Sequence, residues 1–213
     1  MNLPPPALAL GLLVICTAGC DSATDLDVDL SAFNQIPSLG ELDYESVVPS
    51  ADYNYWEYRL AYGDESFEVL GSAGPSAREE LSPDLLAVFD AVFPAFGSGH
   101  ACLPGNCYYY VASVEHNAVD AWSGPEGFRA FLGTIDAEAD AILLARAHDY
   151  HWGSEKKTAA IRAVADGYEL IVLKTVEFCD PVQTNLYLLH VSATGRLVER
   201  QSAIWERKSG VCI

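Results

Sequence analysis

Two of the five histidines, His148 and His151, are three residues apart. On a continuous helix this spacing places both imidazoles on one face, where they could hold one metal ion. Gly153 lies two residues after His151 and indicates that the helix ends near it. A histidine in the last turn of a helix is also explained by its favourable interaction with the helix dipole. We therefore expect no metal and no cofactor, and His148 and His151 are the candidate ligands if a metal is bound.

A second group of residues with reactive side chains lies around His100, with Ser98 before it and Cys102 after it. The serine does not stand in the Gly-x-Ser-x-Gly turn of hydrolases, which follows a strand and opens a helix. We therefore assign no catalytic residue. An exported hydrolase or metal-dependent enzyme that uses His100 or the His148/His151 pair is the alternative that stays open.

Aromatic side chains gather in two stretches that are rich in strand-forming residues. Tyr53, Tyr55 and Trp56 lie in the first, and Tyr108 and Tyr110 in the second. Such side chains give a large contact area at low cost in conformational entropy, so they form a candidate binding surface. Aromatic residues that alternate along strands also pack across neighbouring strands, and the sequence leaves both interpretations open.

Charge excludes two kinds of partner. The chain has 30 acidic and 12 basic residues, for a formal net charge of −18. Nucleic-acid binding needs a basic surface, so no nucleic acid is expected. Anionic lipid headgroups would repel the chain, which rules out peripheral attachment through a basic patch. The surplus of acids favours a soluble, well-solvated surface.

The first twenty residues have the pattern of an export signal. Ala7–Cys16 is apolar apart from Gly11 and is too short to cross a bilayer. The small residues that follow, up to Cys20, resemble the lipobox of bacterial lipoproteins. That resemblance implies cleavage before Cys20, acylation of its thiol and attachment to a bacterial membrane. An ordinary secretion signal cut near Ala18 remains the alternative.

Four cysteines remain once the leader is removed and Cys20 is acylated. They are Cys102, Cys107, Cys179 and Cys212. An even number in an exported protein predicts disulfides. We favour Cys102–Cys107, across a Pro-Gly-Asn turn, together with Cys179–Cys212, although the sequence does not settle the pairing.

The chain divides into a signal peptide (1–19), an acidic flexible tether (20–50) and a single α+β domain (51–213). The tether contains no basic residue and shows no sustained periodicity. Its Asp25, Asp27 and Asp29 resemble the opening of an EF-hand loop. Leu30 and Ile36 stand where that loop needs glycine and glutamate, so no calcium site is expected.

The domain is predicted to contain three helices and eight strands. Strands are expected at 53–62, 67–70, 108–114, 119–122, 158–165, 168–178, 183–191 and 196–205. Helices are expected to begin at Pro83, at Ser123 and after a cap at Asp136. This order indicates an α+β fold with an antiparallel sheet, a C-terminal β-meander and about three helices packed on it, held by disulfides.

The meander gives the most specific structural prediction. Residues 168–178 are apolar on both alternating faces, with Leu170 and Val172 on one and Ile171 and Leu173 on the other. Such a strand is expected at the centre of a sheet. The strand from Arg196 alternates apolar and charged side chains and is expected near an edge.

Together these features indicate a lipid-anchored or secreted protein of the bacterial cell envelope. Its expected role is structural or binding rather than enzymatic. The partner implied is the membrane, through the lipid anchor. A partner protein in the envelope would also fit this role, but nothing in the sequence specifies one.

Overall fold

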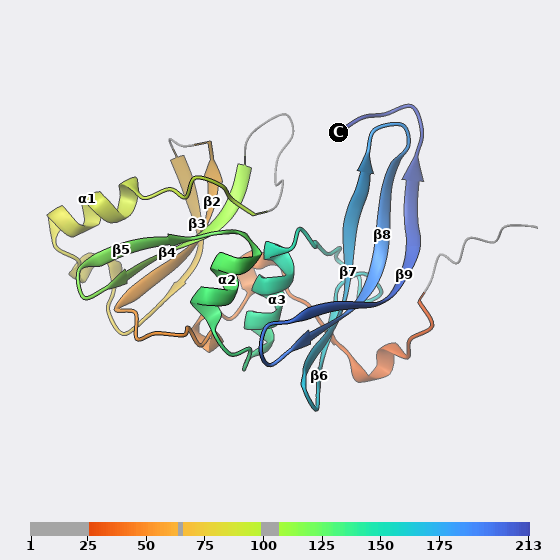
Figure 1. Cartoon of the computed structure of the whole chain (residues 1–213), viewed down its shortest axis with the longest axis horizontal. Coiled ribbons are helices and arrows are strands. Elements are labelled where there is room, and N and C mark those ends of the chain that lie inside the picture. The colour runs from red at the N-terminus through yellow and green to blue at the C-terminus, as the bar shows by residue number, and fades with distance from the viewer. Residues whose placement is uncertain (1–25, 64–65, 99–106) are drawn as a thin grey trace, which may run out of the picture.

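The strands form two separate antiparallel sheets, with helices between and outside them (Figure 1). The structure is a computed structural model that describes residues 26–63, 66–98 and 107–213. Within these residues the strand orders are β3-β2-β4-β5 and β1-β6-β7-β8-β9. The predicted α+β class, C-terminal meander and three helices are confirmed. The sequence did not reveal that the strands divide between two sheets.

The first sheet is buried on both faces of its central strands. It contains β2 (Tyr55–Tyr62), β3 (Ser66–Ala73), β4 (Cys107–Glu115) and β5 (Ala118–Trp122). Helix α1 (Pro83–Ala91) covers the outer face and inserts Phe89. As expected, α1 begins after Ser82, whose hydroxyl accepts a hydrogen bond from the Leu85 amide at 3.3 Å.

The second sheet confirms the predictions made for the meander. It contains β1 (Asn34–Gln35), β6 (Ala160–Val164), β7 (Gly167–Phe178), β8 (Val182–Ser192) and β9 (Leu197–Lys208). Strand β7 lies between β6 and β8, and β9 is at the edge. Leu170 and Val172 enter the main core, whereas Ile171 and Leu173 pack on the opposite face.

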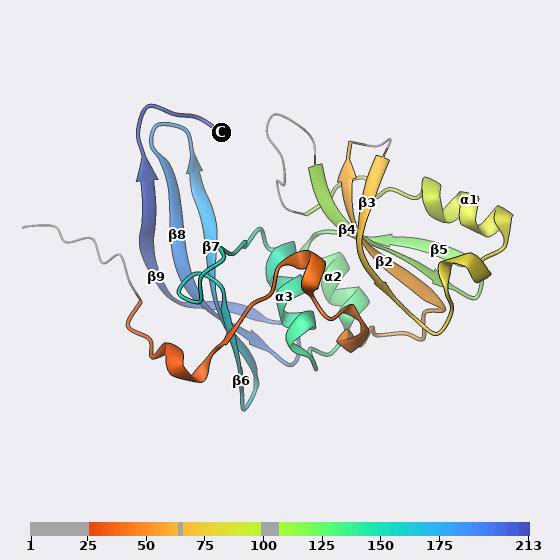
Figure 2. The same ribbon diagram turned by 180° about the vertical axis from the view of Figure 1, so that it is seen from behind.

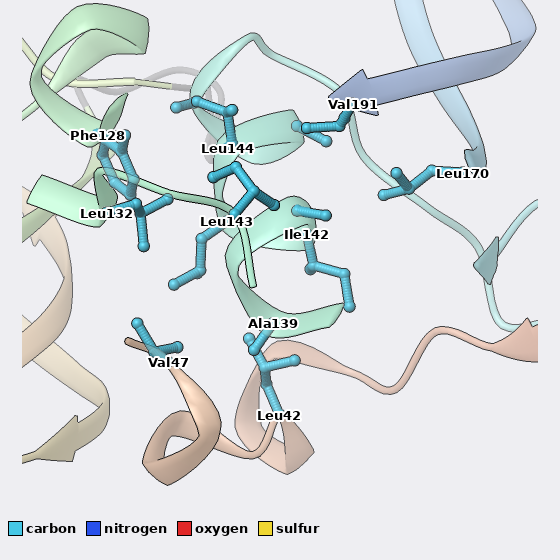
Figure 3. Packing of buried hydrophobic residues seen from close by; sticks show 14 of the residues in the cluster. Leu42, Val47, Phe128, Leu132, Ala139, Ile142, Leu143, Leu144, Leu170 and Val191 are labelled. Carbon is cyan, nitrogen blue, oxygen red and sulfur yellow. The ribbon is translucent and has the colours of Figure 1, made fainter. Parts of the chain in front are cut away.

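Helices α2 (Gly124–Leu132) and α3 (Glu138–Ala147) fill the space between the two sheets (Figure 1). Figure 3 shows Leu143, Leu144 and Ile142 of α3 at the centre of the main core, with side chains from the second sheet, from α2 and from the N-terminal segment around them. Side chains of the first sheet belong to the same core. Leu143 and Leu144 are completely buried. Because α3 is apolar on nearly every side, it can only be stable as an enclosed helix.

Residues 26–50 are not the flexible tether that their acidity suggested. Phe33, Ile36, Leu42, Tyr44 and Val47 are all buried. The segment forms 3₁₀ turns at Leu30–Ala32, Leu39–Glu41 and Tyr44–Ser46, and a further such turn occurs at Arg78–Glu80. Figure 2 shows it crossing from the second sheet over α3 toward β2. Apolar residues spaced between the acids supply enough buried surface to order it.

A disulfide joins Cys179 to Cys212, as predicted. The Ile213 amide also donates to the Phe178 carbonyl at 2.9 Å, so the chain end is fastened to the end of β7. Cys107 is disulfide-bonded too. Cys102 and Cys20 lie outside the described residues, and the Cys102–Cys107 pairing and the lipidation remain predictions.

No helix of the described residues is long and apolar enough to span a bilayer.

The start of α3 is capped by a buried carboxylate. The helix begins after Ala137, so the cap position is one residue later than the one expected at Asp136. Asp140 accepts hydrogen bonds from the amides of Ala137 (2.9 Å), Asp136 (3.0 Å) and Val48 (3.3 Å). Burial raises the pKa of Asp140 to about 6 despite these donors.

Replacement of Asp140 by Asn should change how stability depends on pH. A raised pKa means that the folded state binds the proton more tightly, so this contribution is complete below about pH 4 and is lost as pH rises through 6. The free energy of unfolding of the native chain, minus that of Asp140→Asn, should therefore fall between pH 4 and 7. The fall should be roughly 3 kcal/mol at most. Urea denaturation at several pH values measures it. A difference that rises with pH would contradict the assignment.

Candidate functional site

A cavity of about 570 Å³ lies between the N-terminal segment and the residues that follow α3. Its wall includes apolar parts of Ile36, Leu39 and Trp152 and polar groups of Tyr109, Arg146 and His151. We call it the central cavity. It combines residues from three regions of the chain that are far apart in sequence.

Hydrogen bonds hold the two sides of the central cavity together. His151 exchanges backbone hydrogen bonds with Leu173 of β7, at 2.9 and 2.7 Å. The indole N–H of Trp152 donates to the Pro37 carbonyl at 3.0 Å, which joins this segment to the N-terminal one. Asp149 has a φ of 67°, and this left-handed residue turns the chain away from the helix axis. The wall is therefore built on fixed backbone.

Arg146, near the end of α3, is the cation of the cavity wall. Its Nη1 donates to the Tyr150 carbonyl at 3.1 Å, and the guanidinium lies 4.4 Å from the centre of the Tyr109 ring. Its Nε is buried and has no hydrogen-bond partner among the described residues. No carboxylate among the residues that the structure describes forms an ion pair with Arg146.

His148 and His151 do not share a helix face, because α3 ends at Ala147 and Asp149 turns the chain. Burial lowers the pKa of both, and Lys174 (for His148) and Arg146 (for His151) lower it further. Both imidazoles are thus neutral near pH 7. The described residues contain no group of three metal-ligating side chains, so these two histidines lack the neighbours of a metal site.

The other histidines lie elsewhere. His116 is exposed beside Glu115, and His190 is buried with its Nε2 3.8 Å from a carboxylate oxygen of Asp166. His100 is outside the described residues. The Ser98 hydroxyl accepts a hydrogen bond from the Gly124 amide at 2.7 Å, so it fastens the start of α2.

All five residues of the candidate aromatic binding surface are buried, so that candidate is wrong and the alternative of packing inside the fold holds. Tyr53 and Trp56 pack in the main core, whereas Tyr55, Tyr108 and Tyr110 pack beneath α1. Aromatic side chains occupy both faces of this sheet because both faces are covered. Their neighbour Tyr109 lines the cavity, and the sequence did not single it out from the other tyrosines of its strand. Its alternation with Tyr108 and Tyr110 places it on the opposite face and was the available signal.

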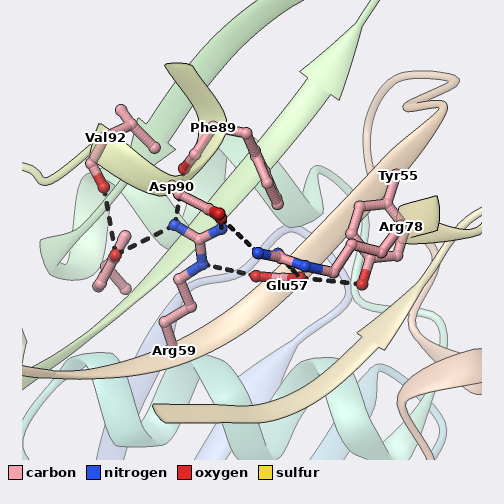
Figure 4. A network of polar contacts seen from close by, with 8 residues as sticks. Tyr55, Glu57, Arg59, Arg78, Phe89, Asp90 and Val92 are labelled. Atoms are coloured by element: carbon pink, nitrogen blue, oxygen red, sulfur yellow. Dashed lines mark hydrogen bonds and ion pairs between the residues drawn. The ribbon is translucent and has the colours of Figure 1, made fainter. Parts of the chain in front are cut away.

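A cluster of buried and half-buried polar side chains lies beneath α1 (Figure 4). Arg59, completely buried, donates from Nε to Glu57 at 2.7 Å and from Nη1 to the Phe89 carbonyl at 2.9 Å. Arg78 joins Glu57 to Asp90, with both distances 2.5 Å. We call these four charged residues the α1 network.

The α1 network fastens α1 to the sheet and does not form a site for chemistry. The guanidinium of Arg59 lies between two aromatic rings, 3.9 Å from the centre of Phe67 and 4.2 Å from that of Phe89. These contacts enclose the cation, and Glu57 supplies the opposite charge. A buried pair of this kind is costly to break, because the remaining charge is left without a partner.

Replacement of Glu57 by Gln should therefore destabilise the fold strongly. It removes the nearer of the two carboxylates beside the buried Arg59 and leaves only Asp90, at 3.8 Å. Loss of one partner of a buried pair costs about 3–5 kcal/mol. Glu206→Gln is the control, because its partner Lys208 is well exposed and exposed pairs contribute little. Chemical denaturation measures both variants. Equal effects of the two substitutions would mean that the α1 network contributes no more than a surface pair.

Comparison of the chain with protein-family models, with curated proteins and with solved structures finds no match.

Proposed function

We propose that this chain is a lipid-anchored binding protein of the bacterial cell envelope that holds a small molecule in the central cavity. The observation that carries the binding role is the cavity, at about 570 Å³ and lined by aromatic, aliphatic and a few polar side chains. Sites for small molecules are usually clefts of about 300–1,000 Å³ with this kind of lining. The leader that ends at Cys20 supports the anchor.

The alternative, an exported hydrolase or metal-dependent enzyme, draws support from His151, whose neutral imidazole lines the same cavity. Ser38 and Glu41 also line it. The Ser38 hydroxyl, however, donates to Glu41 at 2.8 Å. A nucleophilic serine would donate to a histidine that the acid orients. The arrangement therefore favours binding over hydrolysis.

The lipid anchor predicts the chemical form of the mature protein. When the full chain is expressed in a bacterial host, its intact mass from the membrane fraction should match a chain that begins at a diacylated or triacylated Cys20. Cys20→Ala should move the protein to the soluble fraction of the envelope. A mature N-terminus at any residue other than acylated Cys20 would overturn the anchor and favour plain secretion.

The cavity predicts binding of a flat apolar probe. 2-Naphthamide should bind the native chain saturably and with one site in isothermal titration calorimetry. Ser154→Trp, at the exposed rim of the cavity, should weaken binding at least tenfold, because the indole occupies the entrance.

The matched control is Ser209→Trp, the same substitution at an exposed position near the C-terminus. It should leave the affinity for 2-naphthamide unchanged. Absence of saturable binding to the native chain, or equal binding to the two variants, would count against the cavity as the binding site.

A further inference from the structure

Arg146 stands apart from the other half-buried and buried arginines of the described residues. Arg59 and Arg78 both contact Glu57, and Arg162 lies 2.6 Å from Glu169. The chain has 30 acidic residues from which to supply partners. Arg146 is half-buried in a cavity wall and has no carboxylate partner in the described part of the chain.

The guanidinium is also incompletely hydrogen-bonded. Nη1 donates to the Tyr150 carbonyl, and Nε is enclosed without an acceptor. Nη2 also makes no hydrogen bond to the described residues. A guanidinium N–H group that the fold leaves without an acceptor can donate a charge-assisted hydrogen bond to a carboxylate or phosphate. An arginine cannot give up its proton to relieve the cost of burial, so a partner of opposite charge would stabilise it.

The other titratable groups of the cavity leave room for an anion. His151 is neutral near pH 7, because burial and Arg146 lower its pKa. Glu41 is exposed at the rim and accepts from Ser38 at 2.8 Å. The ring of Tyr109 lies against the guanidinium. Among the side chains that line the cavity, Arg146 is the positive charge, and the carboxylate of Glu41 forms no ion pair with it.

The apolar lining restricts the rest of the ligand. Ile36 and Leu39 contribute aliphatic surface, and Tyr109 and Trp152 contribute rings. The hydrogen bond from Trp152 to Pro37 fixes the orientation of its indole. Rings held in this way favour a flat, apolar body over a freely hydrated sugar or peptide.

We infer that the central cavity binds a small organic oxyanion, with its carboxylate or phosphate on Arg146 and its apolar body against Tyr109 and Trp152. This inference rests on the proposed binding function and adds the chemical class of the ligand.

Two isosteric probes test the inference on the unaltered chain. 2-Naphthoate differs from 2-naphthamide in carrying a negative charge. It should bind at least tenfold more tightly in calorimetry at pH 7.5, although the chain's net charge of −18 disfavours anions in general. 2-Naphthyl phosphate identifies the oxyanion: whichever of the two anions binds more tightly is the preferred group.

Arg146→Gln should remove the preference for 2-naphthoate over 2-naphthamide. Arg146→Lys, which keeps the charge but not the planar edge, should retain part of it. The control is Arg129→Gln, which removes an arginine with an exposed side chain that does not line the cavity. It should leave the preference intact.

Equal affinities of the native chain for 2-naphthoate and 2-naphthamide would overturn the inference and leave the binding function standing. No binding of either probe would overturn both. The comparison of probes on the native chain requires no substitution, so it decides the matter even if Arg146→Gln fails to fold.

Discussion

The burial of α3 between the two sheets is the contact on which the rest of the structure depends. Leu143 and Leu144 are inaccessible to solvent and join side chains of both sheets and of α2 in one core. Neither sheet could bury its inner face without this helix, and the helix could not stay soluble outside it. Its two ends also carry polar functions: Asp140 caps the start, and Arg146 reaches the cavity near the end.

Charged groups inside the protein follow two patterns. Beneath α1, Arg59 is enclosed by aromatic rings and paired with Glu57, so its charge is satisfied by the fold itself. At the cavity, Arg146 has a ring beside it and one carbonyl acceptor, but no counter-charge among the described residues. The first arrangement stabilises the position of a helix. The second leaves binding capacity, because a group that the fold does not neutralise can be neutralised by a ligand.

The cavity exists because the N-terminal segment packs on the fold. Ile36 and Leu39 come from that segment, Tyr109 from β4, and Arg146 and Trp152 from the end of α3 and the residues after it. The pairing of β1 with β6 and the hydrogen bond from Trp152 to Pro37 fix the segment in place. If the leader places a lipid on Cys20, the anchor and the cavity wall are separated by only a short stretch of chain.

The sequence alone determined most of the secondary structure. It placed the central and edge strands of the meander, because alternation, turn residues and caps act locally. It favoured the Cys179–Cys212 disulfide without settling it, because a pairing of cysteines 33 residues apart depends on the fold. The sequence could not divide the strands between two sheets, since alternation shows that one face of a strand is buried but does not show which element covers that face. For the same reason the sequence left open whether Tyr53, Tyr55 and Trp56 form a binding surface or pack inside, and the helices that cover both faces decide for packing. The ordered packing of residues 26–50 was missed because the prediction relied on their many acidic residues and not on the five apolar side chains spaced between them.

Only the tertiary structure brought Tyr109 and Arg146 together, because their contact joins β4 to α3 across the core and leaves no periodic signal in either segment.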